Sequence, residues 1–294
     1  MTLREAGFRG EIALEEPLAG HTTWRVGGPA EILATPRDRE DVLLAVRWAA
    51  ASGLPWRVLG NGSNLLVQDA GVRGLVLHLR KVLDAVEVDG GRLRAGAGVL
   101  LPVLANLAAR RGLAGLEFGA GIPGTLGGAI VMNAGWHEWE IGPSVEEVTW
   151  LSPEGRPETL GNADCAFRYR GSMFRDRGGI VLGATLRLTP EEPRVLVERL
   201  QRFAESRKAN QPTELPSCGS VFLKPPGDFA GRLIEQAGLK GYRVGDVEVS
   251  RKHANFFVNL GQARASDVLA LVEHVEGVVL DRFGVRLTRE FEAW

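Results

Sequence analysis

Cysteine is scarce in this chain of 294 residues, which has only Cys165 and Cys218. Two isolated thiols form neither a CxxC motif nor a disulfide framework, and this favours a reducing compartment. Apolar runs of about 18 residues, long enough to span a membrane, are also missing. The N-terminal stretch MTLREAGFRGEIALEE carries acidic residues where a secretory signal needs an apolar core. We therefore expect a cytoplasmic protein that does not bind membranes.

An excess of charge of one sign is missing as well. Lys and Arg number 35 and Asp and Glu number 36, so the formal net charge is −1. No overall field attracts nucleic acid, although local basic sites remain possible. Hydrophobic residues make up 45% and charged residues 24% of the chain, which is typical of a folded protein with two or three cores. We expect no nucleic-acid partner, no metal site and no obligate protein partner.

Two glycine-bearing stretches stand out against this ordinary composition. The first is Gly60 to Val67, GNGSNLLV, and the second is Gly119 to Gly135, GAGIPGTLGGAIVMNAG. Small residues let backbone amides approach an anion without interference from a Cβ atom, so each stretch is a candidate pyrophosphate cradle. Two such loops suggest one large phosphorylated cofactor. The alternative for either loop alone is a tight turn between strands.

Neither loop matches a standard nucleotide-binding motif well. Both lack the lysine of a P-loop. Gly119 to Gly124 does match GxGxxG, and Glu140 lies about where an acid that binds ribose is expected. However, Pro123 and the Gly127-Gly128 pair disfavour the long helix that a dinucleotide fingerprint should open. We predict a tight loop that leads into a short turn.

Hydrophobic periodicity predicts an α+β protein. In the first two thirds of the chain, strands are expected at Glu31–Ala34, Trp56–Leu59, Gly74–Leu79, Val145–Leu151 and Ile180–Leu188, with a hairpin at Gly90-Gly91 and helices at Pro36–Ala51 and Val99–Arg111. In the last third, helices are expected at Arg194–Arg207, Asp228–Gln236 and Ser266–Phe283, with a strand at Asn255–Asn259. Ser266 is the expected N-cap of the last helix and Gly284 its stop.

Five motifs in order give the chain a resemblance to a known family. They are GNGSNLL, GIPGTLGGAIVMNAG, FRYRGSMF, CGSVF and a glutamate near the C-terminus. Together they resemble the UDP-N-acetylenolpyruvoylglucosamine reductases, which make the muramic acid precursor of bacterial peptidoglycan. The run from Leu188 to Arg194 leaves no room for the tyrosine-bearing loop of one branch, so the chain looks like the shorter branch.

The resemblance implies an FAD-binding fold of the vanillyl-alcohol oxidase type. It would comprise one subdomain at 1–80, to which residues 285–294 could return, and a second at 81–190, followed by an α+β substrate domain at 191–294. FAD would be bound non-covalently, because Gly60 to Val67 contains no His or Cys, although His21 and His78 are not far away in sequence. The residues implied to contact FAD are Gly60, Asn61, Gly62, Ser63, Asn64, Leu65, Gly121, Ile122, Pro123, Gly124, Thr125, Gly127 and Ile180.

The family's reaction implies three catalytic residues. Hydride from NADPH reaches the enolpyruvyl ether through FAD, and the charge that develops on the substrate carboxylate must be stabilised. Arg170 matches the family's arginine, whose planar guanidinium suits that charge. Ser220 matches its proton donor, and Glu290 its C-terminal glutamate, expected to act through a hydrogen bond in protonated form, with Glu292 close enough to confuse the register. Without the family match, each would be an ordinary surface or backbone-bonding residue.

Four basic residues are candidates for binding the UDP-sugar substrate: Arg207, Lys224, Lys240 and His253. Lys224 stands where some relatives have asparagine, so its role can differ from theirs. Two other functions stay open from the sequence. One is a flavin oxidase or dehydrogenase of the same fold, which would need neither Ser220 nor Glu290. The other is a nucleotide-sugar sensor without catalysis.

Overall fold

The computed structural model describes residues 1–80 and 82–294. The chain forms two compact units. Unit 1 comprises residues 1–14, 32–61 and 74–205, and unit 2 comprises residues 15–31, 62–73 and 206–294. Residue 81, where a domain boundary was predicted, lies outside the described residues, and the division into three domains stays a prediction.

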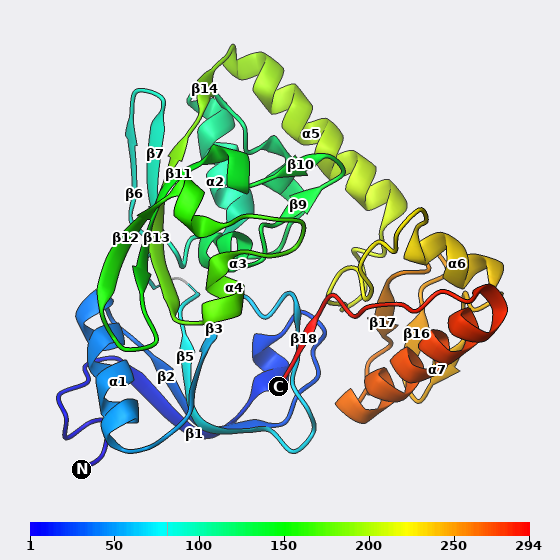
Figure 1. Ribbon diagram of the computed structural model, residues 1–294, viewed down its shortest axis with the longest axis horizontal. Coiled ribbons are helices and arrows are strands. Elements are labelled where there is room, and N and C mark those ends of the chain that lie inside the picture. The colour runs from blue at the N-terminus through cyan, green and yellow to red at the C-terminus, as the bar shows by residue number, and fades with distance from the viewer. Residues whose placement is uncertain (81) are drawn as a thin grey trace. The chain divides into compact units, whose positions relative to one another are not determined.

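A four-stranded sheet begins the fold, with the order β1-β2-β5-β3 (Figure 1). Its strands are β1 (Glu11–Pro17), β2 (Pro29–Thr35), β3 (Trp56–Leu59) and β5 (Val72–His78). β3 runs parallel to β5, and helix α1 (Arg39–Ala51) packs its apolar face into the same core as Leu75 and Leu77. The predicted strands of this region are confirmed. The first glycine loop begins directly after β3, at the end of a parallel strand.

Helix α1 begins three residues later than predicted. Asp38 is its N-cap, and the Asp38 carboxylate accepts a hydrogen bond from the backbone N–H of Asp41 at 3.1 Å. The Arg9 guanidinium donates to Asp38 and to the buried carboxylate of Asp41. Asp38 therefore sets the helix start, since a capping side chain satisfies an N–H that lacks an intrahelical partner.

A five-stranded sheet of order β12-β11-β13-β7-β6 forms the rest of unit 1. Its strands are β6 (Val86–Asp89), β7 (Arg92–Gly96), β11 (Val145–Leu151), β12 (Pro157–Gly161) and β13 (Ile180–Arg187), all antiparallel to their neighbours. The Gly90-Gly91 hairpin is confirmed, with Gly90 at φ +54°. Strand β12 was missed because it is an edge strand whose side chains are exposed or half-buried, so it lacks an apolar signal.

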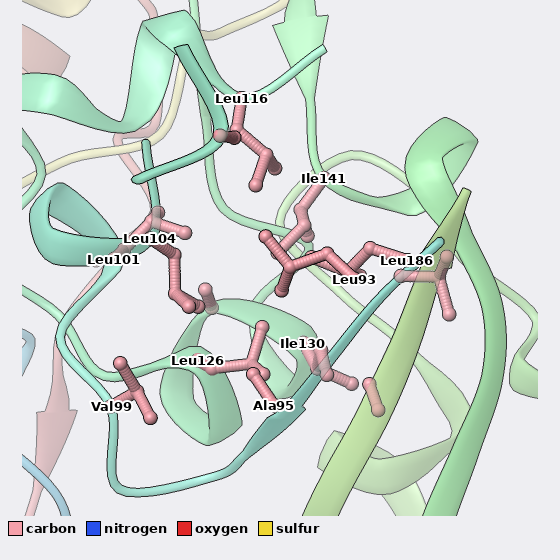
Figure 2. Packing of buried hydrophobic residues seen from close by; sticks show 14 of the residues in the cluster. Leu93, Ala95, Val99, Leu101, Leu104, Leu116, Leu126, Ile130, Ile141 and Leu186 are labelled. Atoms are coloured by element: carbon pink, nitrogen blue, oxygen red, sulfur yellow. The ribbon is translucent and has the colours of Figure 1, made fainter. Parts of the chain in front are cut away.

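Helices α2 (Leu101–Arg110) and α3 (Leu126–Val131) cover one face of this sheet (Figure 1). Figure 2 shows Leu93 and Ala95 of β7 and Leu186 of β13 directed toward the leucines of the two helices. The short elements around them are β8 (Leu113–Ala114), β9 (Gly135–Trp136), β10 (Trp139–Glu140), β14 (Thr189–Pro190), α4 (Met173–Arg177) and the 3-10 turns Glu117–Gly121, Gly142–Ser144 and Asn162–Cys165. The core thus fixes α2 before the second glycine stretch and α3 within it.

Unit 2 is a small α+β body. Its sheet has the order β15-β16-β17, and its other elements pack into one apolar cluster with Trp24 and Phe291. The strands are β15 (Arg243–Val244), β16 (Val247–Val249), β17 (Phe257–Asn259), and a separate parallel pair of β4 (Leu65–Leu66) with β18 (Glu292–Ala293). The helices are α6 (Ala230–Gln236) and α7 (Ala265–Phe283), and the long helix α5 (Pro193–Asn210) ends in this unit.

The N-cap of α7 differs from the prediction. Ser266 is not the cap, because it lies inside the first helical turn. The Asp69 carboxylate, from a distant loop of unit 2, accepts hydrogen bonds from the backbone N–H groups of Ala265 at 2.8 Å and Ser266 at 3.0 Å. Burial acts to raise the pKa of Asp69, but these hydrogen bonds outweigh it, and the net shift of the pKa is downward. Gly284 ends the helix at φ +67°, as expected.

Replacing the capping carboxylate tests this assignment. Asp69→Ala should lower the free energy of unfolding by about 1 kcal/mol, because two helix N–H groups lose their acceptor. Since the pKa of Asp69 is lowered by folding, its contribution is present above the unfolded-state pKa and is lost as pH falls through the folded-state value. Urea titrations at pH 7 and at about pH 3 measure both effects. Asp281→Ala, at the exposed C-terminal end of α7, is the matched control and should not destabilise.

Candidate active site

The two glycine loops meet within unit 1. The side-chain amide of Asn61 donates a hydrogen bond to the backbone carbonyl of Pro123. A Cβ atom on Gly60 would lie 2.7 Å from Oγ1 of Thr125, which is closer than real Cβ contacts. The backbone at Gly60 can therefore approach Thr125 only because residue 60 is glycine. The prediction that both loops serve one site gains support from this contact.

The second loop is held on its inner side by the segment before α2. Leu101 N–H donates to Gly124 O at 2.9 Å, Leu126 N–H to Val99 O at 2.8 Å and Gly127 N–H to Ala97 O at 2.9 Å. Gly127 also packs against Ala97, where a Cβ atom would lie 3.0 Å from the Ala97 Cβ. These contacts give Gly121 to Gly127 a fixed backbone, which a site for a large anion requires.

The short turn predicted after this loop is confirmed. Helix α3 has six residues, begins at Leu126 and is capped by Thr125, whose Oγ1 accepts from Gly128 N–H at 3.3 Å. Helix α3 is thus far shorter than the helix of a dinucleotide-binding βαβ unit, so the GxGxxG match is coincidental. Glu140 accepts a hydrogen bond from Asn133 at 2.7 Å. The Glu140 carboxylate thus has a structural partner, and its position does not require a bound ribose.

The remainder of the first loop belongs to unit 2. Gly62 has φ +58°, and a Cβ atom there would lie 2.3 Å from His21 O. Asn64 bonds the C-terminal segment twice: its Nδ2 donates to Glu290 O at 3.1 Å, and its own carbonyl accepts from Glu292 N–H at 3.0 Å. Leu65 then pairs with Glu292 in the β4–β18 ladder. The C-terminal segment that carries Glu290 is thereby fixed beside this part of the first loop, which also carries Ser63.

Ser220 and Glu290 lie on neighbouring extended segments of unit 2. Glu290 N–H donates to Val221 O at 2.8 Å, and Ser220 forms a β-bridge with Phe256 on the other side. Asn255 fixes the serine segment, because its side chain accepts from Phe222 N–H at 3.0 Å and donates to Phe222 O at 2.8 Å. Both predicted residues are half-buried. Their backbone segments are therefore direct neighbours in unit 2.

The charge of Glu290 acts on the buried thiol of Cys218. Burial raises the pKa of the Cys218 thiol well above its usual value, and the Glu290 charge raises it further. Cys218 therefore stays a neutral thiol, and both cysteines are free and buried. A neutral thiol is a weak nucleophile, so Cys218 acts as a packing residue beside Ser220 and Glu290.

Arg170 occupies a strained position in unit 1. Its backbone is left-handed, with φ +52°, and its carbonyl accepts from Arg175 Nη1 at 2.7 Å. Its Nη2 donates to Gly135 O at 2.9 Å, at the end of the second glycine stretch. A left-handed arginine costs conformational energy and is typical of functional loops. The structure thus ties the predicted arginine to the motif that contains the glycine loop.

Asn133 was not predicted as a site residue, although it lies in the MNAG part of the motif. It is 1% exposed and has φ +43°. Its Nδ2 donates to Glu140 and, at 3.1 Å, to Arg168 O, while its Oδ1 accepts from Gly142 N–H at 2.9 Å. Asn133 therefore joins the loop after α3 to the loop that carries Arg170. The sequence signal that could have identified Asn133 is that asparagine adopts a positive φ more readily than most residues.

Glu117 is a second residue that was not predicted from the sequence. It starts the 3-10 turn Glu117–Gly121 that leads into the second loop and is 4% exposed. Its carboxylate accepts from Arg199 Nη1 of α5 at 2.7 Å and from Gly115 N–H at 2.7 Å. This buried pair anchors the entry to the glycine loop, and spacing in the sequence gave no sign of it.

Ile180 is the last of the residues implied to contact FAD. It is 1% exposed, begins β13 opposite Leu151 and packs with the core of the first sheet. Its side chain is therefore a core side chain, and its contact with FAD stays a prediction.

The four predicted substrate-binding residues fall into two groups. Lys240 and His253 are close together, and Lys240 pairs with Glu235 at 2.7 Å. Burial lowers the pKa of His253, and the Lys240 charge lowers it further, while Nδ1 of His253 accepts from Asn255 N–H at 3.2 Å. His253 is therefore neutral near pH 7.

Lys224 and Arg207 are held differently from this pair. The ammonium of Lys224 lies 4.4 Å from the ring centroid of exposed Phe229, a cation–π contact. Arg207, in the last turn of α5, is half-buried, and burial lowers its pKa to about 10. It stays charged at neutral pH, and no described residue forms an ion pair with it.

Neither a metal centre nor a membrane span is found in the described part of the chain. The residues outside position 81 contain no group of three or more His, Cys, Asp or Glu side chains able to hold a metal ion. Over the same residues, no helix combines the length and apolar character needed to span a bilayer.

Comparison with known proteins decides the family. Residues 211–294 match the family described as UDP-N-acetylenolpyruvoylglucosamine reductase, C-terminal domain, and residues 30–161 match an FAD binding domain. A reductase of this name from Moorella thermoacetica is 47% identical over 290 residues, which are 99% of this chain and 95% of that protein. The chain belongs to the UDP-N-acetylenolpyruvoylglucosamine reductase family.

Other relatives agree with this membership. The reductase from Rubrobacter xylanophilus is 48% identical over 279 residues, which are 94% of this chain and 93% of that protein. The crystal structure of the Thermus caldophilus reductase is similar with a TM-score of 0.83 and 41% identity, covering 98% of this chain and 99% of that one. A cholesterol oxidase structure from B. sterolicum, 16% identical with a TM-score of 0.50 over 62% of this chain and 38% of that one, shares the fold alone. The fold predicted from the sequence, an α+β FAD-binding fold of the vanillyl-alcohol oxidase type with a C-terminal α+β part, is confirmed.

The close approach at Gly60 gives a direct test of the loop contact. Gly60→Ala should weaken FAD binding at least tenfold, because the added methyl group would push Thr125 away and open the space between the loops. Titration of the apoprotein with FAD, followed by quenching of flavin fluorescence, measures the dissociation constant. Gly161→Ala is the matched control: Gly161 is exposed at φ −70°, and the nearest atom would lie 3.7 Å from an added Cβ atom. Equal affinities of the two variants would reject a functional contact at Gly60.

Proposed function

We propose that the protein catalyses the NADPH-dependent reduction of UDP-N-acetylglucosamine enolpyruvate to UDP-N-acetylmuramate, a step of peptidoglycan precursor synthesis, with FAD as its cofactor. The observation that carries the proposal beyond family membership is the pairing of Ser220 and Glu290 on adjacent segments, through the 2.8 Å bond from Glu290 N–H to Val221 O. An oxidase of the same fold would need neither residue in this arrangement. A sensor without catalysis would not need a proton donor beside a carboxyl group.

The residues of the two glycine loops fit FAD. Gly60 and Gly62 leave backbone amides uncovered by side chains, and the fixed backbone of Gly121 to Thr125 lies against Gly60 and Asn61. Oriented N–H groups of this kind bind pyrophosphate. FAD would be held non-covalently, since no His or Cys lies within the loops. The residues proposed to hold it are Gly60, Asn61, Gly62, Ser63, Asn64, Leu65, Gly121, Ile122, Pro123, Gly124, Thr125, Gly127 and Ile180.

The chemistry that FAD supplies when bound is hydride transfer, from NADPH and then to the methylene carbon of the enolpyruvyl group. The protein's own residues must then stabilise the negative charge on the adjacent carbon and carboxylate, and deliver one proton to that carbon. Arg170 is proposed to stabilise the charge, because its guanidinium is permanently cationic and planar. Its strained backbone and its bond to Gly135 O limit the directions in which the guanidinium can point.

Ser220 is proposed to donate the proton from its Oγ. A serine hydroxyl is a weak acid, so transfer requires a site that excludes water and a strongly basic carbon. Glu290 is proposed to assist in its protonated form by hydrogen bonding to the charge that develops.

The substrate's diphosphate is proposed to bind basic residues of unit 2. Arg207 is the strongest candidate because its guanidinium is half-buried and forms no ion pair with a described residue. Lys224, Lys240 and neutral His253 are proposed to contact the rest of the UDP-sugar. We further propose that the substrate domain spans 191–294 after FAD subdomains at 1–80 and 81–190, and that the enzyme works in the cytoplasm without an obligate protein partner, where NADPH and reduced thiols are present.

The absorbance spectrum of the purified protein tests this function. The preparation should be yellow, lose its flavin absorbance on addition of NADPH without oxygen, and recover it when UDP-N-acetylglucosamine enolpyruvate is added. Recovery with the UDP-sugar is specific to the proposed reaction, since an oxidase of this fold would recover only with oxygen. A colourless protein that cannot be reconstituted with FAD would leave only the sensor function.

Removal of the Ser220 hydroxyl separates the two halves of the reaction. Ser220→Ala should leave flavin reduction by NADPH near the normal rate but slow reoxidation by the enolpyruvyl substrate at least a hundredfold, because only the second half needs the proton. Stopped-flow absorbance measures both rates. Ser217→Ala, three residues earlier, is the control and should change neither. Equal losses in both halves would mean that Ser220 has a structural role instead.

A further inference from the structure

The hydroxyl group of Ser220 forms no hydrogen bond with any described residue. Its direction is therefore set by the backbone of the segment that carries it. That backbone is irregular directly before the serine, because Gly219 has φ +86°, in the left-handed region that favours glycine. The aim of the proposed proton donor thus depends on the groups that hold this backbone.

The backbone is also irregular directly after Ser220. Val221 N–H donates to the backbone carbonyl of Asn255 at 2.8 Å, and Phe222 N–H donates to Oδ1 of the same residue at 3.0 Å. In a regular strand, successive N–H groups point to opposite sides, so two in a row do not meet one neighbour. Irregularities of this kind, such as β-bulges, redirect a side chain and are common beside active sites. The segment therefore bends next to Ser220.

The side chain of Asn255 satisfies the backbone groups at this bend. Besides accepting from Phe222 N–H, it donates from Nδ2 to Phe222 O at 2.8 Å. Phe222 and Asn255 are both buried, so loss of the amide would leave a buried N–H and a buried C=O without partners, at a high cost. An asparagine amide can both donate and accept, which this position requires.

Asn255 is itself held in place by the turn before it. Its backbone N–H donates to Nδ1 of His253 at 3.2 Å, and Phe256 N–H donates to His253 O at 2.9 Å. On the other side of the serine segment, Glu290 N–H donates to Val221 O at 2.8 Å. The bend after Ser220 thus lies between a fixed asparagine and the segment of Glu290.

We propose that Asn255 is a positioning residue for proton delivery: its side-chain amide holds the bend after Ser220 and so aims the Ser220 hydroxyl at the substrate carbon. The inference rests on the proposed function, in which Ser220 donates the proton. Asn255 acts through the serine and needs no contact of its own with substrate or FAD. Its loss should therefore affect only the half of the reaction that uses the proton.

Asn255→Ala in the FAD-loaded enzyme tests the proposal. Flavin reduction by NADPH should stay near the wild-type rate, while reoxidation by saturating UDP-N-acetylglucosamine enolpyruvate should slow at least tenfold, because the hydroxyl is no longer aimed. Stopped-flow absorbance measures both rates. Asn255→Asp keeps the acceptor for Phe222 N–H but loses the donor to Phe222 O, so the same half-reaction should slow by a smaller factor. This variant decides the matter if the alanine variant does not fold.

Asn259→Ala is the matched control for lost stability. Asn259 is also buried in unit 2 and also bonds backbone groups: Nδ2 donates to Trp24 O at 3.0 Å, and Oδ1 accepts from Gly261 N–H at 2.7 Å. Both alanine variants should lower the melting temperature, but only Asn255→Ala should slow reoxidation. Equal slowing by the two variants would mean that Asn255 contributes stability alone, and would overturn the proposal.

A double-mutant cycle tests whether Asn255 acts through Ser220. Asn255→Ala added to Ser220→Ala should slow reoxidation no further, because the group that Asn255 positions is already gone. Slowing by the same factor in both backgrounds, or no slowing in the single variant, would overturn the proposal. A wild-type enzyme that the UDP-sugar does not reoxidise would contradict the proposed function itself, whereas normal wild-type reoxidation with an unaffected variant contradicts this inference alone.

Discussion

The close approach of two glycine-bearing loops is the constraint on which the rest of the structure depends. Gly60 can lie against Thr125 only because it lacks a Cβ atom, and Asn61 bonds the carbonyl of Pro123 across the same contact. The first loop follows a parallel strand, and the second is held against the segment before α2 by three backbone hydrogen bonds. The core drawn in Figure 2 fixes α2 before the second glycine stretch and α3 within it. The packing of unit 1 thus holds the backbone of the two glycine loops in place.

In unit 2, backbone hydrogen bonds likewise fix the segments that carry the candidate catalytic side chains. Ser220 and Glu290 are far apart in sequence, yet a backbone ladder between their segments places them together, and Asn255 and Asn64 hold the two segments from outside. Asparagine recurs in such positions, including Asn133 in unit 1, because one amide can donate and accept at once. The chemical groups are thereby supported by amide side chains that hydrogen-bond the neighbouring backbone.

The sequence predicted the elements and motifs well and the long-range contacts poorly. Strands such as Trp56–Leu59 and Val145–Leu151 follow from local apolar pattern, and the glycine loops follow from composition. The start of α7 could not be predicted, because its capping carboxylate, Asp69, comes from a loop far earlier in the chain. Edge strand β12 has no apolar pattern, and the roles of Asn133 and Glu117 depend on hydrogen-bond partners that are distant in sequence. Site residues that belong to a sequence motif could therefore be predicted, and those defined by tertiary contacts could not.

A crystal structure of the protein with bound FAD tests most directly whether the two loops share one cofactor. We expect the pyrophosphate to lie within hydrogen-bond distance of backbone N–H groups from both loops, Gly60 to Asn64 and Gly121 to Thr125. We also expect the close approach of Gly60 to Thr125 to persist in the complex. A pyrophosphate bound by one loop alone, or bound elsewhere on the protein, would contradict a shared site.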